Sequence, residues 1–104
     1  MTRGDVYRVR LGRGRGHEQG GARFGVVVQA SEFLSRSMVI IAPTSTSAFP
    51  ATFRPEIQIE DSTTRVMIDQ LRSIDVARFG KRVRRLTPQE LHDVDDALRV
   101  VLDL

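Results

Sequence analysis

Two short segments of this chain carry side chains that could act on a phosphate ester. In the first, Arg23 follows the glycine pair Gly20 and Gly21 and stands shortly before three consecutive valines. Glycine can turn its N–H group toward an anion in conformations closed to other residues, and the valine run is typical of a buried strand. In the second, Thr44 follows the apolar run of residues 38–42, so its hydroxyl is expected where a buried strand meets a loop. The first segment therefore suits anion binding, although a tight β-turn with a solvated arginine would explain the same residues.

The residue types exclude most other catalytic chemistry. The chain has no cysteine, and its two histidines, His17 and His92, stand far apart without a partner at metal-ligand spacing. The acidic residues at 93, 95 and 96 lie on a predicted helix at spacings that do not converge on one ion, so no metal site is expected. No nucleophile elbow appears, and the glycine-rich loop at residues 12–21 lacks the dinucleotide and phosphate-loop patterns, so no cofactor is expected.

The groups that remain are arginine, a hydroxyl and backbone amides. They suit a reaction in which the substrate supplies its own nucleophile. RNA does this, because its 2′-hydroxyl can attack the adjacent phosphorus and expel the 5′-oxygen. The protein then needs only to orient the strand, move protons and stabilise charge.

The charge distribution favours a polyanionic partner. Of the sixteen basic residues fifteen are arginine, whose planar fork matches pairs of phosphate oxygens, and the formal net charge is +3. Residues 1–36 hold seven arginines against three acidic residues, whereas residues 37–104 are slightly acidic. Surplus arginine can also serve solubility alone.

The length of 104 residues predicts a single domain over residues 1–104. The start of the chain has no apolar segment of the signal-peptide kind, and no apolar run approaches the length of a membrane span. We therefore expect a cytoplasmic protein without a membrane partner.

The N-terminal half shows the patterns of short strands. Residues 5–11 place Tyr7, Val9 and Leu11 on one face and arginines on the other, which is the period of a half-buried strand. The apolar runs at residues 26–28 and 38–42 predict two buried strands. Between them we expect a polar connection, residues 30–37, with Phe33 and Leu34 tucked beneath it. The small-residue loop after Thr44 carries one aromatic, which could stack on an unpaired base or fold back onto the core.

The C-terminal half predicts further strands followed by a helix. Residues 52–60 read as an edge strand marked by Pro55, with Phe53, Ile57 and Ile59 inward. The expected elements that follow are a turn at 61–64, a strand at 65–74, a helical turn at 75–80 that Asp75 caps and Gly80 stops, and a basic strand at 81–86. Thr87, Pro88 and Glu90 form a helix start, and Leu91, Val94, Leu98 and Val101 follow on one face. Closely spaced strands of this kind predict a mainly β, antiparallel and partly closed barrel with a C-terminal helix packed on it.

Three blocks of the sequence resemble the MazF/PemK/Kid family of toxin endoribonucleases. They occur in the family's order: Arg3-Gly4-Asp5-Val6-Tyr7, then Glu18-Gln19-Gly20-Gly21-Ala22-Arg23-Phe24-Gly25-Val26-Val27-Val28-Gln29, and later Asp69-Gln70-Leu71-Arg72-Ser73-Ile74-Asp75. The chain also has the family's usual length, so the likeness covers nearly the whole chain. The resemblance implies a small SH3-like barrel with Arg23 and Thr44 as the catalytic pair. It further implies a homodimer that cuts single-stranded RNA without a metal and is neutralised by a cognate acidic antitoxin. The residues expected to contact RNA are Glu18, Gln19, Gly20, Gly21, Thr46, Phe49 and Gln70.

The sequence departs from the family at one position beside the proposed catalytic arginine. Family members usually have proline there, whereas this chain has Phe24. An arginine is a poor general base, so we assign Arg23 to phosphate stabilisation and proton donation, and Glu18 is a candidate either for the base or for binding an RNA base edge. Two other functions fit the same barrel: a toxin that poisons gyrase by binding, and an RNA-binding barrel without catalysis.

Overall fold

The chain folds into a curled antiparallel sheet with one long helix beside it, as the sequence predicts. The structure is a computed structural model and describes residues 1–33 and 37–104. The strands are β1 (Asp5–Arg10), β2 (Ala22–Val27), β3 (Met38–Ser45), β4 (Glu56–Ile59), β5 (Ser62–Val66), β6 (Arg72–Asp75) and β7 (Phe79–Arg85). Three 3₁₀ turns, η1 (Ser31–Phe33), η2 (Ile68–Gln70) and η3 (Val76–Arg78), and the helix α1 (Pro88–Leu102) complete the fold.

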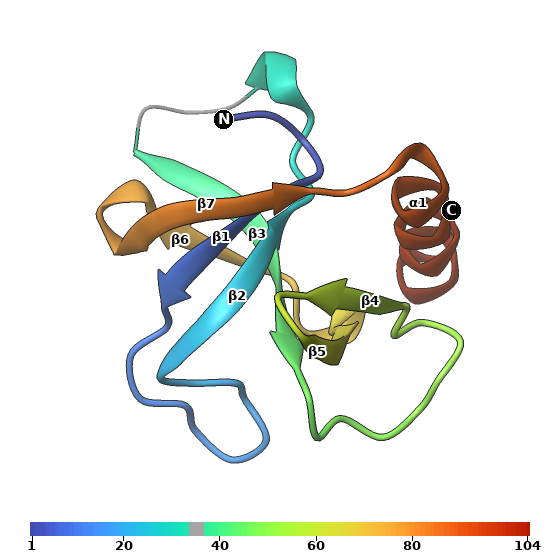
Figure 1. Cartoon of the computed structure of the whole chain (residues 1–104), viewed down its shortest axis with the longest axis horizontal. Helices are drawn as coiled ribbons and strands as arrows, with labels where there is room; N and C mark the ends of the chain where they lie inside the picture. The colour runs from blue at the N-terminus through green and yellow to red at the C-terminus, as the bar shows by residue number, and fades with distance from the viewer. Residues whose placement is uncertain (34–36) are drawn as a thin grey trace.

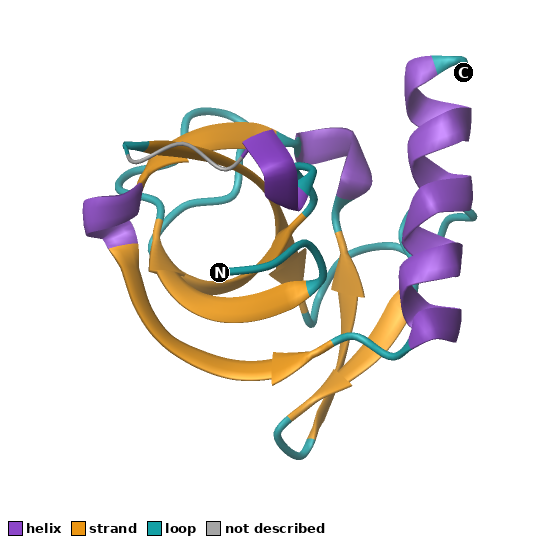
Figure 2. Cartoon of the chain, turned by 90° about the horizontal axis from the view of Figure 1, so that it is seen from above, coloured by secondary structure: helices purple, strands orange, loops and turns teal. Residues whose placement is uncertain are grey.

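The sheet closes most of the way into a barrel, and α1 lies outside it (Figures 1 and 2). The strands follow the order β4-β5-β3-β2-β1-β7, and β6 pairs with β3 outside this order. Every pairing is antiparallel. Among the described residues no helix is both long and apolar enough to cross a bilayer.

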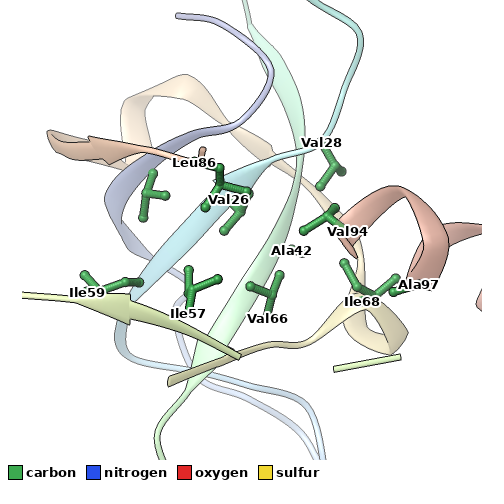
Figure 3. Packing of buried hydrophobic residues seen from close by; sticks show 11 residues of the cluster. Val26, Val28, Ala42, Ile57, Ile59, Val66, Ile68, Leu86, Val94 and Ala97 are labelled. Atoms are coloured by element: carbon green, nitrogen blue, oxygen red, sulfur yellow. The ribbon is translucent and has the colours of Figure 1, made fainter. Parts of the chain in front are cut away.

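Two apolar clusters lie on the two faces of the central strands. The cluster inside the curl includes Val9, Val27 and Ile41, and the other lies between the sheet and the helix and includes Val26 and Ala42. Figure 3 shows Val94 and Ala97 of α1 among the residues of the second cluster. Neighbouring residues of one strand therefore enter different clusters, which explains why the sequence there is continuously apolar instead of alternating.

The predicted N-terminal caps of the helical segments are confirmed, whereas the predicted stop at Gly80 is wrong, because η3 ends at Arg78 and Gly80 lies within β7. Thr87 Oγ1 accepts the N–H of Glu90 at 3.1 Å, and the Glu90 side chain accepts the N–H of Thr87 at 2.8 Å, so the capping box is complete. Asp75 Oδ1 accepts the N–H of Ala77 at 2.8 Å at the start of η3. These features depend on neighbours in sequence, so local chemistry predicts them well.

The predicted single strand over residues 65–74 is wrong, because η2 interrupts it. β5 pairs with Thr44 and Ser45 near the end of β3, and β6 pairs with the beginning of the same strand, residues 38–41. The 3₁₀ turn carries the chain from one pairing to the other. The expected turn at 61–64 is also wrong, because β4 and β5 join in a tight hairpin through Glu60 and Asp61, and Glu60 has a φ of 54°.

Several predicted boundaries and burials in the first half also differ from the structure. β3 does not end before Pro43, since it continues to Ser45. Proline fits there because the neighbour of β3 changes from β6 to β5 at this point. Met38 and Ile40 are each 42% exposed, so the run is not fully buried. Phe33 is 71% exposed instead of lying beneath the connection, and Leu34 lies outside the described residues.

The Arg-Gly-Asp segment at the start of the chain joins the helix to the barrel. Arg3 Nε donates to the carbonyl oxygen of Val28 at 2.8 Å, and its Nη2 pairs with Asp95 of α1 at 2.6 Å. Asp5 is only 2% exposed and pairs with Arg85 of β7 at 3.0 Å. The segment thus has a structural role, because it connects α1, the end of β2 and β7.

Candidate functional site

A groove of about 570 Å³ opens at one end of the barrel, and it contains both residues of the proposed catalytic pair. Its walls come from β1, the start of β2, the end of β3, the β4–β5 hairpin and the η3–β7 junction. The lining residues central to the argument are Arg8, Arg10, Arg23, Phe24, Thr44, Thr46, Glu60 and Arg78. Four arginines against one acidic side chain make the described part of this groove positive, which suits an anionic ligand.

Arg23 is held by the glycine-rich loop that precedes it. Strand β2 begins at Ala22, so Arg23 lies within the strand, opposite Val9 of β1, and not in the turn before it. Its Nε donates to the carbonyl oxygen of Gly20 at 3.0 Å. The two terminal nitrogens form no hydrogen bond or ion pair with any described residue, so they can bind phosphate oxygens.

Thr44 lies deeper in the same groove. It is 3% exposed and is the second-last residue of β3, inside the strand instead of in the loop after it. Its hydroxyl donates to the carbonyl oxygen of Phe24 at 3.0 Å, which fixes the side chain across the β2–β3 pair. The lone pairs of Oγ1 remain, so the hydroxyl can accept a hydrogen bond from a ligand while it holds this bond, and it must release Phe24 before it can donate to a phosphate oxygen.

The glycines of the loop allow two pieces of backbone to cross closely. A Cβ on Gly20 would lie 2.4 Å from the backbone nitrogen of Gly14, so no larger residue fits. Gly21 has a φ of +74°, and its N–H donates to the carbonyl oxygen of Gly12 at 2.6 Å. That amide is therefore engaged within the loop and cannot at the same time donate to a phosphate. The loop positions Arg23 through the carbonyl oxygen of Gly20, which accepts the hydrogen bond from Arg23 Nε.

The second group of predicted site residues lies in an adjacent recess. Glu18 and Gln70 line it, together with Asp69 and Arg72. Gln70 holds the loop at both ends of its amide: Oε1 accepts the N–H of Gln19 at 2.8 Å, and Nε2 donates to the carbonyl oxygen of His17 at 2.8 Å. Gln70, which the sequence predicts to bind an RNA base, is bound in the structure to the loop that carries Gly20.

Two further side chains of this recess have fixed roles. Arg72 Nη1 donates to the carbonyl oxygen of Gln19 at 3.0 Å, and Glu18 Oε1 accepts the N–H of Arg15 at 3.2 Å. Hydrogen bonds from Arg54 lower the pKa of Asp69, and the same pairing raises the pKa of Arg54. Asp69 is therefore a firmly ionised structural partner and a poor acceptor for a catalytic proton.

Two predicted RNA-binding residues, Thr46 and Phe49, follow Thr44 along the chain, and only the first of them lines the groove. Thr46 lines the groove beside Thr44. Phe49 lines neither recess, and its ring is 83% exposed, so the alternative that it folds back onto the core is wrong. An exposed ring in a loop that starts at the groove is free to stack on an unpaired base.

Comparison with known proteins identifies the family. Residues 2–102 match the family described as PemK-like, MazF-like toxins of type II toxin–antitoxin systems. The chain belongs to this family.

Relatives of this MazF-like toxin agree in sequence and in fold. A candidate toxin from Mycobacterium tuberculosis is 41% identical over 106 residues, which cover 100% of this chain and 99% of the relative. MazF from Deinococcus radiodurans has a TM-score of 0.85 at 20% identity, covering 100% of this chain and 97% of its own. An endoribonuclease from a mycobacterial species, solved with its cognate antitoxin, has a TM-score of 0.81 at 21% identity, covering 100% and 96%. At these identities the solved structures establish the shared fold.

The structure of this MazF-like toxin adds groove residues that the sequence analysis missed. Arg8 Nη2 pairs with both carboxylate oxygens of Glu60, at 3.2 and 3.1 Å, and the Arg8 guanidinium lies 5.0 Å from the centre of the Phe24 ring. The alternation of apolar and charged residues in β1 correctly predicted that the Arg8 side chain lies on the opposite face of the strand from Tyr7 and Val9. Nothing local to β1 indicates that this second face meets the β4–β5 hairpin, because that contact joins residues 52 positions apart.

Proposed function

We propose that this MazF-like toxin is an endoribonuclease that cuts single-stranded RNA without a metal ion. The observation that supports this most strongly is the placement of Arg23 and Thr44 in one arginine-lined groove, with the terminal nitrogens of Arg23 unpaired among the described residues. The arginine-lined walls provide positive charge for the RNA backbone. Membership in the toxin family and the endoribonuclease function of structurally similar proteins support the same assignment.

In the proposed reaction the 2′-hydroxyl of the substrate gives its proton to solvent water and attacks the adjacent phosphorus. The bond from phosphorus to the 5′-oxygen breaks, the 5′-oxygen takes a proton from Arg23, and Arg23 regains its proton from solvent. Arg23 stabilises the negative charge that develops on the phosphoryl oxygens and donates a proton toward the leaving oxygen. When RNA binds, the Thr44 hydroxyl turns from the Phe24 carbonyl and donates its hydrogen bond to the same phosphoryl group. Products are a 2′,3′-cyclic phosphate and a 5′-hydroxyl.

The proposed RNA contacts extend on both sides of the catalytic pair. Thr46 and the exposed ring of Phe49 follow Thr44 along the chain and can bind and stack on neighbouring nucleotides. Glu18, Gln19, Gly20, Gly21 and Gln70 form the loop and its anchor. We assign Gly20, Gly21 and Gln70 to shaping this side of the groove, and Glu18 and Gln19 to reading base edges once RNA is bound.

We further propose that the toxin acts in the cytoplasm as a homodimer and is neutralised by a cognate antitoxin. An acidic, disordered segment would match the arginines of the groove and block RNA at the same place. Solved relatives bound to antitoxins support this partner class. Sedimentation of the purified protein tests the dimer. Competition between RNA and an acidic antitoxin peptide tests the shared site.

The catalytic assignment is tested with an oligonucleotide that carries a single 2′-deoxy sugar at the cut site. We expect wild-type protein to cut the all-RNA strand in buffer that contains a chelator and to leave the substituted strand intact at that site. Removing one such stabilising donor typically lowers turnover by about 10²–10³-fold, so Arg23→Ala should lose at least about 100-fold in kcat.

A matched variant, Arg99→Ala, removes an arginine of α1 that lines neither recess, and it should retain full activity. Cleavage of the 2′-deoxy strand at the substituted position would refute the mechanism. Growth arrest by Arg23→Ala equal to that of wild type would refute the nuclease assignment and favour a toxin that acts by binding alone.

A further inference from the structure

The ion pair between Arg8 and Glu60 spans the wall of the groove. Arg8 comes from the middle of β1, and Glu60 comes from the tight turn between β4 and β5. Both side chains line the groove that contains Arg23. In the β1–β2 register Arg8 lies opposite Phe24, the residue directly after Arg23, so the two arginines reach the groove from neighbouring strands.

The guanidinium of Arg8 is oriented in a way that suits a second ligand. One face lies over the Phe24 ring at 5.0 Å, which limits the rotamers of the long side chain. Nη2 alone contacts Glu60, while Nε and Nη1 have no hydrogen-bond partner among the described residues. Much of its planar fork is therefore available for paired contacts with phosphate oxygens.

The partner of Arg8 is easily displaced. The two side chains are 55% and 57% exposed, and an ion pair in such contact with water contributes little to stability. Glu60 also has a φ of 54°, a left-handed conformation that residues other than glycine adopt with some strain. The pair is thus a weak contact, and a phosphate entering the groove can replace the carboxylate at Arg8.

We propose that Arg8 is a second phosphate-binding residue of this groove, and that Glu60 occupies it while the groove holds no RNA and competes with the RNA backbone for it. This inference rests on the proposed function, because it names a contact to the same substrate. Phe24, at the position where the family usually has proline, provides the ring that supports Arg8. Arg8 acts in binding and positioning, whereas Arg23 acts on the reacting phosphate.

The test measures binding of a fluorescent single-stranded oligonucleotide whose sugars are all 2′-deoxy, which this chemistry does not cut. Glu60→Gln removes the competing charge and keeps the size of the side chain. The matched control is Glu56→Gln, because Glu56 pairs with Arg65 at 3.1 Å on the same hairpin and does not line the groove. We expect Glu60→Gln to bind about two- to fivefold more tightly than Glu56→Gln, the range that an exposed ion pair allows.

A second arm measures the contribution of Arg8 itself. Arg8→Ala should weaken binding and reduce the slope of log K against log salt by about 0.7, the change expected for one lost phosphate contact on a single strand. In the Arg8→Ala background, Glu60→Gln should change the affinity no more than Glu56→Gln does, because the guanidinium for which Glu60 and phosphate compete is absent. Equal affinity of Glu60→Gln and Glu56→Gln for the oligonucleotide would overturn the inference. An effect of Glu60→Gln that persists in the Arg8→Ala background would overturn it as well.

The result is separable from the nuclease assignment. Wild-type protein that cuts RNA while Glu60→Gln binds like Glu56→Gln would keep the proposed function and remove the role of Arg8. If the variants bind as expected but the wild-type protein cuts no RNA, the role of Arg8 in binding is kept and the nuclease assignment is removed. Failure of wild-type protein to bind the oligonucleotide at all would overturn the inference as well.

Discussion

Replacing Asp5 by asparagine should destabilise the protein, because the carboxylate joins three parts of the chain at a buried position. Asp5 is 2% exposed. Its Oδ2 accepts the N–H of Thr2 at 2.9 Å, and its Oδ1 lies 3.0 Å from Arg85 Nε and 3.5 Å from Arg82 Nη1. The substitution keeps the size of the side chain and one acceptor oxygen, so it removes the charge without making a cavity.

The expected loss follows from these contacts. A hydrogen bond to a charged group contributes about 1.5–3 kcal/mol net. The two arginines are more than half exposed, so their ion pairs add only about 0–1 kcal/mol after screening by water. Since asparagine can still accept the N–H of Thr2, we expect the free energy of unfolding to fall by about 2 kcal/mol, or roughly 9 °C in Tm for a domain of this length.

The pH dependence of this loss has a definite sign. Burial by itself raises the pKa of Asp5. The hydrogen bonds from Arg85 and Thr2, with the charges of Arg85 and Arg82, outweigh burial and bring the pKa below its usual 3.8. A carboxyl with a lowered pKa in the folded protein stabilises it above the unfolded value, and this stabilisation is lost as pH falls through the folded value. The difference between wild type and Asp5→Asn should therefore be constant above about pH 5 and shrink below about pH 4.

Urea unfolding at several pH values and one fixed protein concentration measures this difference, since assembly would otherwise contribute to stability. The control is Asp61→Asn, because Asp61 is exposed and forms no hydrogen bond or ion pair with the described residues. Other carboxylates titrate equally in both proteins and cancel. A variant as stable as Asp61→Asn at pH 7, or a gap that stays constant down to about pH 2, would refute this account of the Arg-Gly-Asp segment.

Three more substitutions test the parts of the structure that position the groove. Gly20→Ala places a Cβ 2.4 Å from the backbone nitrogen of Gly14 in the loop that holds Arg23, so the proposed kcat/KM on RNA should fall at least about tenfold. Gly16→Asn, at an open position of the same loop, should retain activity. Gly25→Ala places a Cβ 3.2 and 3.3 Å from methyl groups of the two neighbouring strands, and overpacking should cost about 1–2 kcal/mol in urea unfolding. Arg54→Ala breaks the paired contacts with Asp69 at 3.1 and 2.8 Å, so the loop after β3 should become more sensitive to protease, with a stability loss of about 1 kcal/mol.

Each of these three expectations has an outcome that contradicts it. Full activity of Gly20→Ala would show that the loop crossing does not position the arginine. A stability of Gly25→Ala equal to wild type would show that the barrel relaxes around the added methyl group. Unchanged proteolysis of the 46–55 loop in Arg54→Ala would show that the ion pair does not restrain it.

The sequence by itself determined the features that depend on neighbours along the chain. The capping box at Thr87 and the Asp75 cap join groups three and two residues apart, and alternation in β1 separates the apolar face from Arg8 and Arg10. The mainly β fold with a C-terminal helix followed from these patterns, and the order of three motif blocks indicated the toxin family that comparison confirms.

Only the tertiary structure decided which residues meet at the groove. A strand pattern shows which face of a segment is apolar, but it does not show which other strand pairs with it or where that pairing ends. For this reason the break at η2, the exposure of Phe33 and the attachment of Gln70 to the loop at His17 and Gln19 could not be predicted. The Arg8–Glu60 pair depends on the same long-range register, because it forms only where the β4–β5 hairpin turns toward β1.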